Sequence, residues 1–98
     1  MSAGEQQVFE VRLRSKRVQR ALDALQGVDY DRVVVKLGAL ANDPRPQGCE
    51  KLYNAIYRVR VGDFRVIYLI DEKKKQVEVG GIRRRSERTY KSVKELFR

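Results

Sequence analysis

Two strand-like segments joined by Gly62 and Asp63 constrain the fold more than any other feature of the chain. Residues 56–61 and 64–70 are rich in β-branched and aromatic side chains, which favour β-strands. A two-residue connection that begins with glycine is typical of a tight β-hairpin, and the length of the turn sets the pairing register. The expected pairs are Val61 with Phe64, Arg60 with Arg65, Val59 with Val66 and Arg58 with Ile67.

The two faces of this hairpin differ in chemistry. The apolar face, which we expect to be the core, holds Tyr57, Val59, Val61, Phe64, Val66, Tyr68 and Ile70. The opposite face holds Arg58, Arg60 and Arg65. Because Arg60 and Arg65 lie directly across from each other, their like charges disfavour the sheet. A bound polyanion turns this repulsion into charge-assisted contacts. The competing explanation is neutralisation by Glu10 or Glu78 from neighbouring strands.

The segment before the hairpin predicts a strand and two helices. Residues 7–13 alternate as in a half-buried strand. The helical stripes are Val18, Ala21, Leu22 and Leu25, and then Val33, Val34, Leu37, Leu40 and Ala41. Ser15 and Asp29 are placed to cap these helices, and Gly27 is placed to stop the first.

A last strand covers residues 76–82, with Gly80 and Gly81 at a bulge or at its end. The order β-α-α-β-β-β predicts an α+β fold, a four-stranded antiparallel sheet with two helices packed on one face. The stripe of Val93, Leu96 and Phe97 allows a short C-terminal helix. We expect residues 1–98 to form a single domain with a flexible N-terminus over 1–6.

The charge of the chain gives the first indication of a partner. Lys and Arg number 22 against 13 acidic residues, a net charge of +9, and the pI is near 10.1. Such a field attracts nucleic acid, and a basic protein without that partner is the alternative. The single cysteine, Cys49, fits a reducing cytosol, and no apolar run reaches membrane-spanning length. We therefore expect a cytoplasmic protein without a membrane partner.

Basic residues also concentrate after the last strand. Residues 83–98 hold seven basic and two acidic side chains, beginning with Arg83, Arg84 and Arg85. Tyr90 follows, and an aromatic ring beside guanidinium groups can stack on a base while they hold its phosphate. The alternative for Tyr90 is packing of a terminal helix onto the body.

The residue types present limit the chemistry. The chain has no histidine, no metal-ligand cluster and no glycine-rich phosphate loop, so we expect neither histidine catalysis nor a metal or other cofactor. RNA can still be cleaved by its own 2′-hydroxyl when arginines stabilise the developing negative charge. An arginine is a poor general base, so the expected enzyme is slow unless a partner orients the RNA.

Three stretches resemble a known family, the RelE/ParE toxin superfamily: LYNAIYRVRVGDFRVIYLID, the preceding LANDPRPQG, and VGGIRRRSERTY. The resemblance implies a RelE-type mRNA interferase of a type II toxin–antitoxin system. By position, Arg65 matches the arginine that contacts the scissile phosphate, and Arg83 the one that stabilises the transition state, with Arg84 or Arg85 as substitutes. Tyr90 matches the tyrosine that stacks on the nucleotide and can take part in proton transfer. Arg58 and Arg60 replace lysines proposed to activate the 2′-hydroxyl, which leaves the general base open. Lys51 and Arg88 complete the expected RNA-binding set.

The resemblance also implies partners, namely a cognate antitoxin, in a heterodimer or heterotetramer, and the ribosome with its mRNA. The stripe of Val93, Leu96 and Phe97 is the element that we expect the antitoxin to displace. The ParE branch inhibits DNA gyrase and typically lacks the arginine–tyrosine set. Because this chain has that set, the resemblance favours the RelE branch. A ParE-like gyrase inhibitor and a non-catalytic RNA-binding relative are the alternatives.

Overall fold

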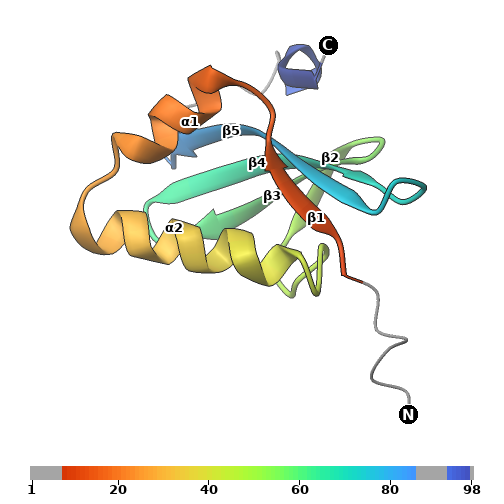
Figure 1. The fold of residues 1–98 in the computed structure, drawn as a ribbon, viewed down its shortest axis with the longest axis horizontal. Coiled ribbons are helices and arrows are strands. Elements are labelled where there is room, and N and C mark those ends of the chain that lie inside the picture. The colour runs from red at the N-terminus through yellow and green to blue at the C-terminus, as the bar shows by residue number, and fades with distance from the viewer. Residues whose placement is uncertain (1–7, 86–92, 98) are drawn as a thin grey trace.

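The computed structural model describes residues 8–85 and 93–97. The elements, shown in Figure 1, are β1 (Glu10–Leu13), α1 (Lys16–Asp23), α2 (Gly27–Leu40), β2 (Glu50–Tyr53), β3 (Ile56–Val61), β4 (Phe64–Asp71), β5 (Gln76–Arg84) and the short 3-10 helix η2 (Val93–Phe97). The α+β class and the two helices on one face of a sheet are confirmed. Within the described residues no helix has the length and apolar character needed to cross a membrane.

The sheet is five-stranded and mixed, with the strand order β1-β5-β4-β3-β2. The prediction of four antiparallel strands is wrong in two respects, because β2 adds a fifth strand and β1 runs parallel to β5. Parallel and antiparallel strands share the same alternation of side chains, so periodicity cannot give their direction. Three of the four residues of β2 are exposed, and this edge strand therefore lacks an alternating apolar pattern.

The hairpin of β3 and β4 has the predicted register. Val61 pairs with Phe64, Arg60 with Arg65, Val59 with Val66 and Arg58 with Ile67. Gly62 has a φ of 60°, a conformation that glycine adopts without the strain that a side chain brings. The turn residue and the loop length thus determine which side chains meet across the two strands.

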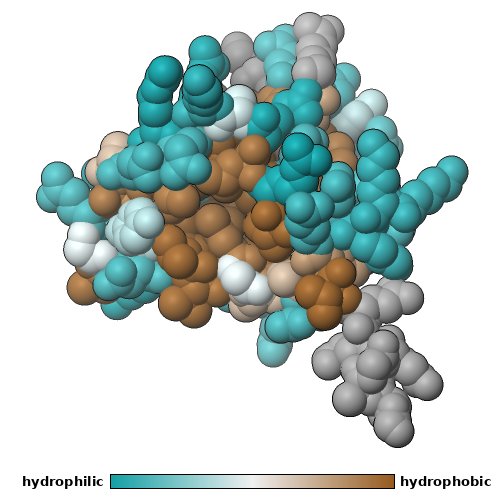
Figure 2. Space-filling model, viewed as in Figure 1, coloured by the Kyte–Doolittle hydropathy of each residue, from teal (hydrophilic) through white to brown (hydrophobic). Residues whose placement is uncertain are grey.

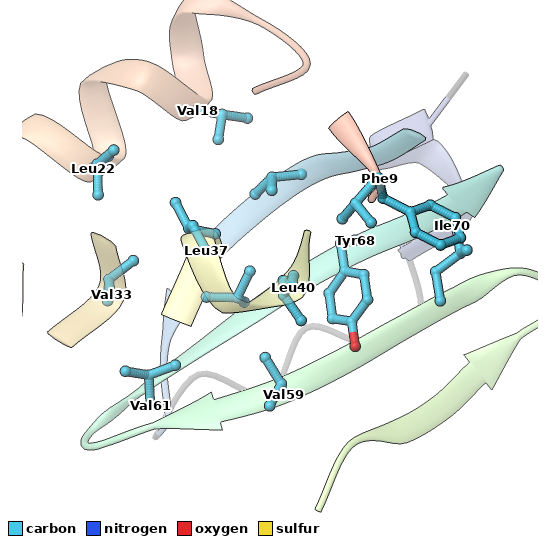
Figure 3. Close-up of a cluster of buried hydrophobic side chains, with 13 residues drawn as sticks. Phe9, Val18, Leu22, Val33, Leu37, Leu40, Val59, Val61, Tyr68 and Ile70 are labelled. Atoms are coloured by element: carbon cyan, nitrogen blue, oxygen red, sulfur yellow. The ribbon is translucent and has the colours of Figure 1, made fainter. Parts of the chain in front are cut away.

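Both helices pack on one face of the sheet, and Figure 3 shows their apolar side chains directed at the strands. This core contains Phe9, Val18, Leu22, Val33, Leu37, Leu40, Val59, Val61, Val66, Tyr68, Ile70, Val77 and Val79. The predicted cap of α1 is confirmed, because the Val18 N–H donates to the Ser15 hydroxyl at 3.4 Å. The predicted cap of α2 is wrong. That helix starts at Gly27, with Gln26 as its N-cap, and Asp29 lies in its first turn.

Helix α2 carries apolar side chains on its outer side as well. Val34, which its spacing assigned to the core, is 40% exposed, whereas Val33 is fully buried. Four of the large exposed apolar side chains lie on this helix: Val28, Tyr30, Val34 and Val35. Figure 2 shows hydrophobic surface between hydrophilic groups on this side of the molecule. By helical spacing Val28 and Val35 lie on one side of α2, and Tyr30 and Val34 lie on another.

The second face of the sheet is apolar in one half, which the sequence did not predict. There Ile56 and Ile67 pack with Val93 of η2. Gly80 forms the predicted bulge, since Ile67 pairs with Gly81 and Tyr68 with Val79. A Cβ at Gly80 would lie 2.5 Å from Cζ of Phe97, so this glycine lets the C-terminal ring approach the strand closely. The short C-terminal helix is confirmed, and it covers this half of the sheet.

Replacing Tyr68 by phenylalanine is expected to lower the free energy of unfolding by about 1–3 kcal/mol at neutral pH. The buried Tyr68 hydroxyl donates to the Pro44 carbonyl at 2.7 Å, and Tyr68→Phe leaves that oxygen without its donor. Burial, followed by the Cys49 thiol, raises the pKa of Tyr68 above its ordinary value. The stabilisation is therefore complete below about pH 10, the ordinary pKa of tyrosine, and is lost above it. Urea unfolding of both proteins at pH 7 and above pH 10 should show the difference shrinking, and a constant difference would contradict this account.

Candidate nucleic-acid interface

Four arginines share the second face of the sheet beside its apolar half, and we call them the arginine surface: Arg58, Arg60, Arg65 and Arg83. Arg60, Arg65 and Arg83 are consecutive partners across β3, β4 and β5. Directly paired residues project to the same side of a sheet. Arg60 and Arg65, whose pairing was predicted, therefore have a third arginine beside them on the same face. This is Arg83, which comes 18 residues after Arg65 in the chain.

A carboxylate reaches the arginine surface from the edge strand. Glu50 of β2 is the register partner of Arg58 and forms an ion pair with it. The two acids of the competing explanation have other partners. Glu78 pairs with Arg14 at 3.0 Å, and Glu10 accepts a hydrogen bond from Gln76 at 3.3 Å. Glu78 lies on β5, two strands away from Arg58, and Glu10 lies on β1, three strands away.

Arg65 is partly exposed and stands among other cations. Partial burial, followed by Arg58 and Arg85, lowers the pKa of Arg65, and Glu50 opposes this effect. The ordinary pKa of an arginine lies far above neutral pH, so the Arg65 guanidinium remains protonated there even with a lowered pKa. The clustering of like charges instead creates a positive potential that an anionic ligand relieves.

An open cavity of about 470 Å³ lies at the hairpin end of this face, lined by Asp63, Arg65, Arg84 and Arg85. The backbone N–H of Arg85 donates to the Asp63 carbonyl at 2.7 Å, which continues the alignment of β5 with the turn. The Arg60 Nε donates to the Gly62 carbonyl at 3.3 Å. The turn thus lies beside one open cavity, which three arginines line and which is large enough to admit a phosphate group.

The structure brings some predicted residues together and separates others. Arg84 pairs with Phe64, and its guanidinium lies 5.1 Å from the centre of that ring, so it reaches the cavity from the other side. Lys51 pairs with Tyr57 and projects to the face that carries the helices, away from the arginine surface. Arg88 and Tyr90 lie outside the described residues.

The described part of the chain holds no group of three or more acidic, histidine or cysteine side chains that could bind a metal ion. What it does present is a set of guanidinium groups in fixed positions on adjacent strands. Guanidinium forks match phosphate oxygens and form charge-assisted hydrogen bonds with them. The surface can therefore bind a polyanion and stabilise negative charge on it.

The match to a family model decides the identity. The model for the ParE toxin of type II toxin-antitoxin system, parDE, matches residues 13–89. The chain belongs to this family. The matched residues include β3, β4, β5 and the two helices, so the arginine surface lies within the matched range. No curated protein matches the sequence of this toxin.

Solved toxin structures share the fold. The archaeal RelE–RelB complex from Pyrococcus horikoshii OT3 is similar at 28% identity and a TM-score of 0.75, over 83% of this toxin and 99% of that chain. The RelBE2 toxin–antitoxin complex from Mycobacterium tuberculosis is similar at 23% identity and a TM-score of 0.68, over 82% and 94%. The isolated E. coli RelE toxin has 15% identity and a TM-score of 0.70, over 91% and 99%. The toxin is thus a member of the RelE/ParE superfamily, as the sequence motifs indicated.

Proposed function

We propose that this toxin is a ribosome-dependent endoribonuclease that cleaves translated mRNA and so inhibits translation. The observation that carries the proposal is the alignment of Arg60, Arg65 and Arg83 on three adjacent strands, beside a cavity that Arg85 also lines. Like charges placed side by side are unfavourable for folding, and a bound RNA backbone makes them favourable.

The proposed reaction needs no metal ion. The 2′-hydroxyl of the RNA attacks the adjacent phosphate, and arginines stabilise the charge that develops on the phosphate oxygens. We assign the scissile phosphate to Arg65 and the transition-state charge to Arg83 or Arg85, which line or adjoin the cavity. Tyr90 is proposed, from the family motif, to stack on the nucleotide. The ribosome is proposed to orient the RNA for this attack, because the reaction depends on the geometry in which the 2′-hydroxyl faces the phosphate.

Other cations are proposed to bind the RNA backbone on either side of the cleaved bond. Arg58 and Arg60 extend the arginine surface along β3, and Arg84 borders the cavity. Arg88 is assigned to this set by sequence alone. Lys51 lies on the other face, so we assign it only to the long-range attraction of RNA.

A second candidate function is inhibition of DNA gyrase, which the match to a ParE model favours. A protein that inhibits gyrase by binding it does not need its arginines to converge on one phosphate. The convergence of Arg65, Arg83 and Arg85 is the reason for preferring the ribonuclease.

The proposed protein partner is a cognate antitoxin, in a heterodimer or heterotetramer. The toxins from P. horikoshii and M. tuberculosis were each solved in a toxin–antitoxin complex. The exposed apolar side chains Val28 and Val35 of α2 offer an area that a partner can cover. The segment η2, which packs on Gly80 and Gly81, is the proposed element that the antitoxin displaces.

Expression of the toxin in bacteria is expected to produce new mRNA 5′ ends inside translated codons, together with growth arrest. Such ends arise because the cleavage requires mRNA on the ribosome, so an untranslated transcript in the same cells should stay intact. Mapping 5′ ends across the transcriptome checks this. Growth arrest with intact mRNA and an accumulation of gyrase-linked DNA breaks would establish the second candidate function instead.

A further inference from the structure

The edge strand β2 contains an irregularity that turns an aromatic side chain toward the face of the arginine surface. Lys51 pairs with Tyr57. The next pair joins Tyr53 to Ile56, which leaves Leu52 as an extra residue in β2. Alternation alone would place Tyr53 on the face of the helices, like Lys51. The β-bulge re-aims it, so that Tyr53 lies on the second face of the sheet, with its partner Ile56.

Tyr53 is accessible on this face, unlike its neighbour in the bulge. Leu52 packs against the apolar cluster of Ile56, Ile67 and Val93, whereas Tyr53 is 46% exposed. Nζ of Lys94, on η2, lies 4.8 Å from the centre of the Tyr53 ring. An accessible ring beside a cation suits a nucleotide, because the base can stack on the ring while the cation binds the phosphate.

The position of Tyr53 continues the line of the arginine surface along the sheet. Arg60, Arg58 and Ile56 follow one another on the same face of β3, and Tyr53 is the partner of Ile56. Four residues of β3 separate Arg60 from Ile56, a distance of about 13 Å at the usual rise of a strand. An RNA strand whose phosphate lies at the arginines can therefore present a nearby base to the ring.

We propose that Tyr53 and Lys94 form a second nucleotide-binding subsite, in which an unpaired mRNA base near the cleaved bond stacks on the Tyr53 ring. This inference rests on the proposed ribonuclease function. Lys94 is exposed, and its flexible stem lets the ammonium group bind the phosphate of the same nucleotide. The subsite holds a different nucleotide from the one assigned to Tyr90. Because stacking is stronger for larger bases, it favours a purine at its position in the mRNA.

The first test compares Tyr53→Leu with Tyr30→Leu in single-turnover cleavage of mRNA on purified, programmed ribosomes. Tyr30 is a matched control because it is also a partly exposed tyrosine, at 38%, and lies on α2. Tyr53→Leu is expected to raise the toxin concentration that gives the half-maximal rate about tenfold, without a change in the maximal rate. Tyr30→Leu should change neither quantity. Tyr53→Phe keeps the ring and should recover the affinity that Tyr53→Leu loses.

A fluorescent base separates stacking from a structural role of the ring. The mRNA carries 2-aminopurine at successive positions on both sides of the cleavage site, and a 2′-deoxynucleotide at the cleaved position removes the attacking hydroxyl. Stacking quenches the fluorescence of 2-aminopurine. Quenching at one position should therefore be lost in Tyr53→Leu and kept in Tyr30→Leu and Tyr53→Phe.

Each result supports or overturns a distinct statement. Equal quenching by Tyr53→Leu and the unaltered toxin at every position, or an unchanged half-maximal concentration, would overturn the subsite while the ribonuclease function stands. A lower maximal rate together with a lower unfolding temperature would mean that the ring only holds η2 in place, which also overturns the subsite. If the unaltered toxin leaves ribosome-bound mRNA intact, the proposed function itself fails. Thermal unfolding of Tyr53→Leu is expected to resemble that of the unaltered toxin, because the side chain is exposed.

Discussion

Arg65→Ala is expected to reduce the rate of mRNA cleavage by about a hundred- to a thousandfold, the usual effect of removing one donor that stabilises transition-state charge. Arg65 is central to the site because it lies between Arg60 and Arg83 and lines the cavity. The measurement is single-turnover cleavage on programmed ribosomes, with growth arrest in expressing cells as a second readout. Arg65→Lys keeps the charge but not the fork of donors, so it should restore only part of the rate.

Arg45→Ala is the control for this prediction, because it removes the same charge elsewhere. Arg45 bonds to Glu72 and to the Tyr57 hydroxyl, and its guanidinium lies 5.3 Å from the centre of the Tyr57 ring. Its replacement should leave cleavage near the rate of the unaltered toxin. Equal losses in the two variants would show that net charge, and not the arrangement of the arginine surface, governs activity. Full activity of Arg65→Ala would remove the arginine surface from the catalytic site.

The largest effect on stability is expected from Leu40→Ala, which should lower the free energy of unfolding by about 2–5 kcal/mol. Leu40 is fully buried in the core between α2 and the sheet, and the smaller side chain leaves a cavity there. A loss of this size is a large share of the total stability of a small domain, which is about 5–15 kcal/mol. Urea-induced unfolding measures it directly.

Val34→Ala on the same helix is the matched comparison. Val34 is 40% exposed, so its truncation should change the free energy of unfolding by only about 0.5 kcal/mol, as is usual at the surface. A cost in Val34→Ala close to that of Leu40→Ala would mean that Val34 belongs to the core after all. The pair therefore tests whether α2 has the orientation that its apolar spacing alone did not determine.

Helix α2 shows why part of the fold could not be predicted from the sequence, namely which side of the helix is buried. Val33 and Val34 are adjacent, and both fit an apolar stripe, since α2 is apolar on more than one side. Periodicity identifies a buried face only when the opposite face is polar. The residues that cover the second face of the sheet were likewise unexpected, because Val93 lies 26 residues beyond Ile67, the side chain with which it packs.

The candidate site also has one part that the sequence predicted and another that it did not. The pairing of Arg60 with Arg65 follows from a two-residue turn, and the structure confirms it. Glu10 and Glu78, the acids of the competing explanation, contact Gln76 and Arg14 instead, and Glu50 was missed as the acid beside Arg58. The sequence gives little indication of where Glu50 lies, because the exposed edge strand β2 has no alternating pattern from which its register could be predicted.

The sequence by itself determined the hairpin, its register and the side of the sheet on which its arginines lie. These follow from local properties, the alternation of side chains and the conformation of Gly62, which act between residues close in the chain. Only the tertiary structure decided the parallel pairing of β1 with β5, the addition of Arg83 to the arginine surface and the approach of Glu50 to Arg58. These depend on which strands become neighbours, and that choice is made by burial of the whole core, because no local pattern specifies it.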